Sequence, residues 1–170
     1  MGHRLAIMLA AGLICCFSSV ATAAVINVVG GYNFTGVNSF DVLELTAGGN
    51  VTDDSSASIY VSETFTVYAG SSITLGDSIS NITSFGAIHL TAGNSISLAE
   101  RDAMHVLSAR APQGVSLTAG GNVSISPGGN VMGSRINITS PDGIHNNGVI
   151  SSGGGLSLDI FINPGPAPWV

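Results

Sequence analysis

The sequence predicts an all-β chain wound as a parallel β-helix, or β-solenoid, of about six coils. The first observation behind this prediction is a recurring stretch in which an apolar residue, small residues and a Gly/Asn pair precede an apolar–polar alternation. The second is the spacing of the copies, which begin at positions 45, 67, 90, 117 and 138. Spacings of 21 to 27 residues are typical of stacked-repeat proteins. The third is a composition with 23 glycines and only 8% charged residues.

The copies share one pattern of strand and corner. Leu117–Ile125 reads LTAGGNVSI, Leu45–Val51 and Leu90–Ile96 are close copies, and the stretches that begin at 67 and 138 are looser. Alternation with a period of two indicates half-buried strands. The Gly and Asn pairs supply corners that a β-branched residue would not occupy at low cost. The residues expected to lie in one column along the rod are Leu45, Val67, Leu90 and Leu117.

The chain divides into four segments. Residues 1–23 are expected to be a signal peptide, because Arg4 precedes an apolar run, Leu5–Phe17, that ends before Ala21-Thr22-Ala23. That run is short for a membrane span, so no membrane insertion is expected after cleavage. Residues 24–40 are expected to form an amino-terminal cap and residues 41–162 the solenoid repeats. Residues 163–170 form a Pro-rich tail, where proline ends strand pairing.

The leader also holds the only cysteines, Cys15 and Cys16. Neither follows a small residue, so a signal-peptidase site is favoured over lipidation. Within the repeats, Ala99–Pro112 is the longest departure from the pattern. Met104 and Leu107 are compatible with one side of a short helix, but the sequence favours a loop followed by a strand at 106–109.

The charge balance excludes several classes of partner. After the leader the chain has no lysine, and three arginines against ten Asp and Glu give a formal net charge of −7. An acidic surface argues against nucleic acid as a partner. Without cysteine the remaining chain offers no disulfide and no thiolate metal site. We expect a secreted protein, extracellular or at the cell surface, with the periplasm as the alternative location.

Two stretches resemble a known family. Gly114–Ile125 and Gly143–Gly154 look like the haemagglutinin repeats of filamentous haemagglutinin-type adhesins, and the resemblance extends over residues 41–160. It implies a right-handed parallel β-helix, an adhesive role, and a host or cell-surface glycan or protein as partner. Those adhesins begin with a secretion domain, whereas only Val25–Phe40 stands between the leader and the repeats here.

Carboxylates recur after the second strand of several repeats. Asp53, Asp54, Asp77 and Glu100 lie 8 to 10 residues beyond their repeat starts. If the coils are in register, these side chains would form an acidic ridge able to hold calcium, which prefers oxygen ligands. A solvated row of loop residues is the simpler interpretation, and no metal site is assigned.

The candidates for catalysis are few. Beyond the leader the histidines are His89, His105 and His145, and the compact charged group is Arg101, Asp102 and His105. Acid–base catalysis needs groups held within hydrogen-bond reach of one another, and a single loop positions them poorly. We therefore assign no catalytic residue and no cofactor.

Asparagines followed by Ser or Thr two positions later occur at Asn33, Asn50, Asn81, Asn122 and Asn137. Such sites accept glycans in some secretory proteins. The repeat produces them automatically, and stacked asparagines can instead hydrogen-bond along the rod. We interpret them as structural.

The sequence therefore predicts a secreted, non-catalytic β-solenoid that acts as a surface adhesin or matrix protein. The alternatives are a fibre subunit that self-associates by coil stacking and a solenoid that binds or cleaves carbohydrate. A further alternative is that these residues are a segment of a longer adhesin.

Overall fold

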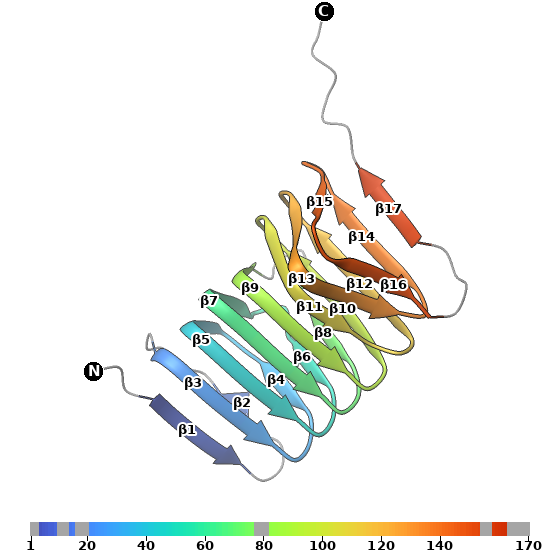
Figure 1. The fold of residues 1–170 in the computed structure, drawn as a ribbon. Coiled ribbons are helices and arrows are strands. Elements are labelled where there is room, and N and C mark those ends of the chain that lie inside the picture. The colour runs from blue at the N-terminus through green and yellow to red at the C-terminus, as the bar shows by residue number, and fades with distance from the viewer. Residues whose placement is uncertain (1–3, 10–13, 16–20, 77–81, 154–157, 163–170) are drawn as a thin grey trace, which may run out of the picture.

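The computed structural model describes residues 4–9, 14–15, 21–76, 82–153 and 158–162, and the side chains of 23–76 and 83–153. The described residues contain strands and turns and no helix. The chain alternates between two parallel sheets and forms a β-solenoid of about six turns, as predicted (Figure 1). Three features named above lie outside the described residues: Asp77, Asn81 and the tail 163–170.

The larger sheet, called sheet A here, has nine strands and the smaller, sheet B, has eight. In spatial order sheet A contains β1 (Arg4–Leu9), β3 (Ala21–Val28), β5 (Val37–Ala47), β7 (Ser58–Ala69), β9 (Ile82–Ala92), β11 (Met104–Arg110), β13 (Val123–Gly133) and β15 (Ile144–Asn146), and β16 (Val149–Ser152) also pairs with β13. Sheet B contains β2 (Ile14–Cys15), β4 (Tyr32–Phe34), β6 (Val51–Asp53), β8 (Ile73–Leu75), β10 (Ser95–Glu100), β12 (Gly114–Ala119), β14 (Ile136–Ser140) and β17 (Leu158–Ile162).

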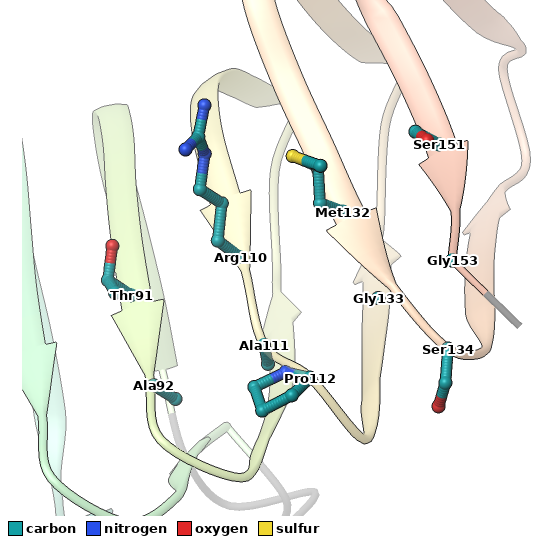
Figure 2. A pocket seen from close by; sticks show the side chains of 10 residues that line it. All are labelled: Thr91, Ala92, Arg110, Ala111, Pro112, Met132, Gly133, Ser134, Ser151 and Gly153. Carbon is teal, nitrogen blue, oxygen red and sulfur yellow. The ribbon is translucent and has the colours of Figure 1, made fainter.

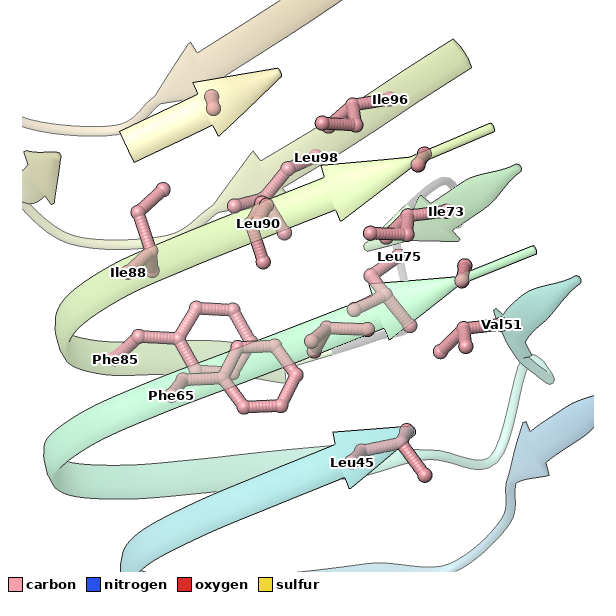
Figure 3. Packing of buried hydrophobic residues seen from close by; sticks show 14 of the residues in the cluster. Leu45, Val51, Phe65, Ile73, Leu75, Phe85, Ile88, Leu90, Ile96 and Leu98 are labelled. Atoms are coloured by element: carbon pink, nitrogen blue, oxygen red, sulfur yellow. The ribbon is translucent and has the colours of Figure 1, made fainter. Parts of the chain in front are cut away.

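Strict register places equivalent residues directly over one another. In sheet A the backbone pairs Leu45 with Val67 and Val67 with Leu90, and all three side chains are fully buried. These residues form the interior column that the sequence predicts, and Figure 3 shows the same packing for Leu45 and Leu90. Every pairing between described strands is parallel, so each coil adds one strand spacing to the rod.

The prediction for Leu117 is wrong. Leu117 lies in sheet B, where it pairs with Leu98 and Ile138, whereas the residue next to Leu90 in sheet A is Ala109. The 27-residue spacing between Leu90 and Leu117 is therefore not the length of one coil. Equivalent positions are 22 residues apart from Leu45 to Val67 and 19 apart from Leu90 to Ala109.

The corners explain why one motif serves both sheets. Gly48, Gly70 and Gly93 turn the chain out of sheet A, and their amides continue the ladder, as in the bond from Gly70 N to Ala47 O at 2.8 Å. Gly120 makes the equivalent bond at the opposite corner, from its amide to Glu100 O at 2.9 Å. The Leu-Thr-Ala-Gly motif thus marks the end of a strand before a corner, in either of the two sheets.

The long strands β5, β7 and β9 bend within their length. Register shifts after Phe40 in β5 and after Val61 in β7 mark the bends, which give these coils a third short side. Aromatic rings fill the wider interior, where Phe65 and Phe85 stack with ring centroids 4.4 Å apart. Figure 3 shows this pair beside the aliphatic columns.

Two segments assigned from the sequence take part in the stack. In the region 24–40, β3 pairs with β5 through Ile26 and Leu45, and β4 pairs with β6, so these residues form a coil in register with the repeats. The stretch 99–112 contains β11, a strand, in agreement with the favoured loop-and-strand interpretation. It is not an excursion, because β11 pairs with both β9 and β13.

We expect Gly70→Ala to lower the free energy of unfolding by about 1–3 kcal/mol, the usual cost of overpacking a close contact. A Cβ at Gly70 would collide with the carbonyl group of Gly48 on the neighbouring coil. Urea unfolding followed by far-UV circular dichroism measures the change. Gly30→Ala is the matched control, because a Cβ there meets no heavy atom within 4 Å. Equal stability of the two variants would contradict the tight stacking of corners.

Candidate functional site

The described carboxylates do not gather into the acidic ridge considered above as a calcium site. Asp53 Oδ2 accepts a hydrogen bond from Gly76 N at 2.9 Å and so joins two coils. Asp54 Oδ1 accepts bonds from the amide and hydroxyl groups of Ser56, and these bonds lower the pKa of Asp54. Glu100 is buried. Within the part of the chain that the structure describes, no three His, Cys, Asp or Glu side chains lie together as metal ligands.

Glu100 closes the third side of the solenoid. The first part of β9 pairs with β7 up to Phe85, but pairing with β11 begins only at Ile88. Glu100 Oε1 accepts a bond from Phe85 N at 2.7 Å, and the next amide, Arg101 N, donates to Thr83 O at 3.1 Å. These bonds take the place of the missing strand. Sequence reasoning missed this role because the burial of Glu100 depends on the register of three coils.

The environment of Glu100 favours its neutral form. Its side chain is 4% exposed, and Oε2 has no hydrogen-bond partner among the described residues. Burial raises the pKa of Glu100 to about 8, the charge of Asp102 raises it further, and the bond from Phe85 N opposes both. A buried, neutral carboxylic acid is the result at neutral pH.

The histidines lie on outward positions of sheet A. His89 is half-buried on β9 and makes an edge contact with Tyr68, with ring centroids 6.4 Å apart. His105 on β11 is exposed and hydrogen-bonds to Ser126 through Nε2. His145 on β15 is exposed, and the backbone register places one strand between it and His105. The structure therefore does not bring the three imidazoles together.

The charged group Arg101, Asp102 and His105 lies where the chain turns from β10 into β11. All three side chains are exposed. The corner is held by backbone atoms, as when Asp102 O accepts from Gly121 N at 3.0 Å. The arrangement offers charges in solvent rather than a preorganised acid–base set.

Two of the predicted structural asparagines bond along the rod. Asn33 Oδ1 accepts from Thr52 Oγ1 at 2.8 Å, one coil away. Asn50 Oδ1 accepts from Ser72 N at 3.0 Å, again across one coil. Asn122 and Asn137 are half-buried in the later coils. These contacts follow from stacking and agree with a structural role for Asn33 and Asn50.

The outer surface of sheet B is a row of short polar side chains. Successive register positions carry hydroxyl or amide groups and no charge over six strands, in the order Asn33, Thr52, Thr74, Ser97, Ser116 and Asn137. A second, partial row begins with Ser72 and Ser95, whose hydroxyl groups bond at 3.1 Å. Neutral hydrogen-bonding groups thus repeat at each strand spacing.

Two grooves flank the corner that joins sheets A and B in the later coils. The first, called the Arg110 groove, has a volume of about 510 Å³ and lies at the ends of β9, β11, β13 and β16 (Figure 2). Its lining residues are Thr91, Ala92, Arg110, Ala111, Pro112, Met132, Gly133, Ser134, Ser151 and Gly153.

The second groove, called the Arg135 groove, lies on sheet B and has a volume of about 450 Å³. Ser134 lines both grooves. Sequence reasoning missed them, because their residues come together only when Leu117 is placed in sheet B. The signal available in the sequence was Arg110, a rare basic residue at the end of an alternating segment.

The residues that the structure describes include no helix that is long and apolar enough to cross a bilayer.

Glu100→Gln should flatten the pH dependence of stability. The folded-state pKa of about 8 exceeds the ordinary value of 4.5, so between these values the folded chain binds more protons than the unfolded chain. The contribution of Glu100 to the free energy of unfolding is therefore fully present below about pH 4.5 and is lost as the pH rises through about 8. Glutamine keeps an acceptor for Phe85 N but does not titrate.

Urea unfolding of both proteins, at intervals between those two pH values, measures the difference. Asp142→Asn is the control, because it removes a carboxylate from an exposed position. If the Glu100→Gln variant keeps the wild-type slope of stability against pH, Glu100 does not titrate as described.

Comparisons with protein-family models, curated proteins and solved structures find no match to this chain. The fold and the two grooves are therefore the basis for any functional inference.

Proposed function

We propose that this chain is an exported, non-catalytic β-solenoid that works by adhesion, as a surface adhesin or a structural protein of an extracellular matrix. The observation that carries the proposal is the in-register repetition of polar side chains on the outer surface of sheet B. A surface that repeats the same hydrogen-bonding group suits a partner that is itself repetitive. Several weak contacts then act together and raise the avidity.

The packed interior supports a role for the rod as a rigid scaffold. Columns such as Val51, Ile73 and Ile96 are almost fully buried in sheet B, opposite those of sheet A. Close-packed interiors deform little, so the outer rows keep their spacing. A rigid scaffold lowers the entropy cost of binding.

The dispersed charges favour adhesion over catalysis. His89, His105 and His145 lie on different strands of sheet A, and Glu100 is held in the interior. The parallel β-solenoid is compatible with β-helix repeat proteins, and a β-helix is the fold that the resemblance to the adhesin repeats implies. Membership of that family is part of the proposal.

Export is the first part of the proposal to test. Expression of the full chain in a secreting bacterium should release a protein that begins at Ala24, as intact mass and amino-terminal sequencing would report. Cleavage there would remove β1, β2 and the first three residues of β3, and would leave the rest of β3 and β4 as the edge strands of sheets A and B. Retention of the full mass in the cytoplasm would contradict export.

Adhesion is tested with the purified protein coupled to beads. We expect the beads to bind at least one class in a panel of glycans and matrix proteins, whereas beads with the heat-unfolded protein do not. Turnover of a glycan would favour the carbohydrate-cleaving alternative. Fibrils with a 4.7–4.9 Å meridional repeat would favour the fibre subunit, and absence of any binding would contradict adhesion.

A further inference from the structure

The Arg110 groove lies beside a single outward row of side chains. The backbone register runs from Tyr68 through Thr91, Arg110 and Met132 to Ser151, one residue per strand. Figure 2 shows the side chains of Thr91, Arg110 and Met132 on the same side of successive strands. Tyr68 and Arg110 are two strand spacings apart, about 9.6 Å.

Arg110 brings a rare positive charge into the groove. It is one of three basic residues after the leader, in a chain with ten acidic residues. Its side chain is exposed, and no carboxylate of the described side chains forms an ion pair with its guanidinium group. An unpaired guanidinium offers parallel N–H donors that match a carboxylate.

The rest of the lining combines apolar and hydroxyl groups. Ala92, Ala111 and Pro112 form an apolar floor where small side chains leave space at the corner (Figure 2). Thr91 and Ser151 add hydroxyl groups at the border. Small-molecule sites commonly pair an apolar lining with a few polar groups that fix orientation.

Tyr68 extends the surface beyond Thr91. Its side chain is 40% exposed, and the edge contact with His89 holds the ring. An exposed, supported tyrosine is amphipathic, with an apolar face and a polar hydroxyl group. The apolar faces and hydroxyl groups of a sugar ring have the complementary chemistry.

An acidic peptide fits this groove less well. The strands under it, β9, β11 and β13, each have a paired strand on both sides. An extended peptide gains affinity chiefly by adding a strand to a free edge. The only such edge at the groove, among the described strands, is the side of β16 away from β13. A peptide added there would lie three strand spacings, about 14 Å, from β11, which carries Arg110. A saccharide binds through side chains and needs no edge.

We infer that the Arg110 groove, together with Tyr68, binds a carboxylate-bearing saccharide, with the carboxylate on Arg110 and a sugar ring toward Tyr68. This inference names a ligand class for the adhesive surface and so rests on the proposed function. The Arg135 groove is not included, because it lies on sheet B and not beside the row of sheet A that contains Tyr68 and Arg110.

The test is titration calorimetry of the purified protein with trigalacturonic acid and with its fully methyl-esterified form. The ester keeps the rings and hydroxyl groups but removes the charge. We expect Arg110→Gln to weaken binding of the acid by at least about tenfold, the size of one charge-assisted hydrogen bond. Arg101→Gln is the matched control, because it removes the same charge from an exposed corner outside the groove. We expect it to change binding less than about twofold.

Several results would overturn the inference. Equal weakening by Arg101→Gln and Arg110→Gln would indicate attraction by overall charge alone. Equal affinity for the ester would remove the role of the carboxylate, and equally tight binding of tetraglutamate would indicate a peptide site. No binding of the acid would also reject the inference, whereas the adhesive function fails only if the bead panel shows no partner. Circular dichroism of both variants confirms the fold.

Discussion

Parallel strands stacked in strict register are the constraint on which the rest of this structure depends. Each coil must present a side chain of compatible size and polarity directly over its neighbour, because the backbone ladder fixes the relative position. Apolar residues therefore recur inside, as in Leu45, Val67 and Leu90. Glycines recur at corners where the carbonyl groups of adjacent coils leave no room for a Cβ, as at Gly70 and Gly93. The same register aligns the polar rows on the outer faces.

Much of the fold follows from the sequence for this reason. Period-two alternation and recurring Gly/Asn corners predict parallel stacking, and three of the four residues assigned to the interior column lie in it. Leu117 does not, because an identical motif ends a strand in the other sheet. Local sequence records that a strand ends and a corner begins. It does not record which of two alternating sheets that strand belongs to, since both corners impose the same steric demand.

The candidate site was less predictable, since it depends on contacts between coils. In the sequence Glu100 belongs to a series of loop carboxylates. In the structure it is buried, at the place where Phe85 has no neighbouring strand on one side. The Arg110 groove joins residues from four strands, more than 60 positions apart from Thr91 to Gly153. A shift in the assumed coil length moves Arg110 to a different neighbour. Errors of a few residues in period, harmless for fold class, are therefore decisive for the site.

The direction of the backbone ladder has a mechanical consequence. Because the hydrogen bonds between coils run along the rod, tension applied between the two ends pulls directly on them, and coils would peel away one after another from an end. A coil of 22 residues, such as that from Leu45 to Val67, would lengthen from one strand spacing to about 70 Å of extended chain. A β-solenoid that links two bodies would therefore unfold coil by coil under tension. The work absorbed in unfolding would protect its attachment from breaking.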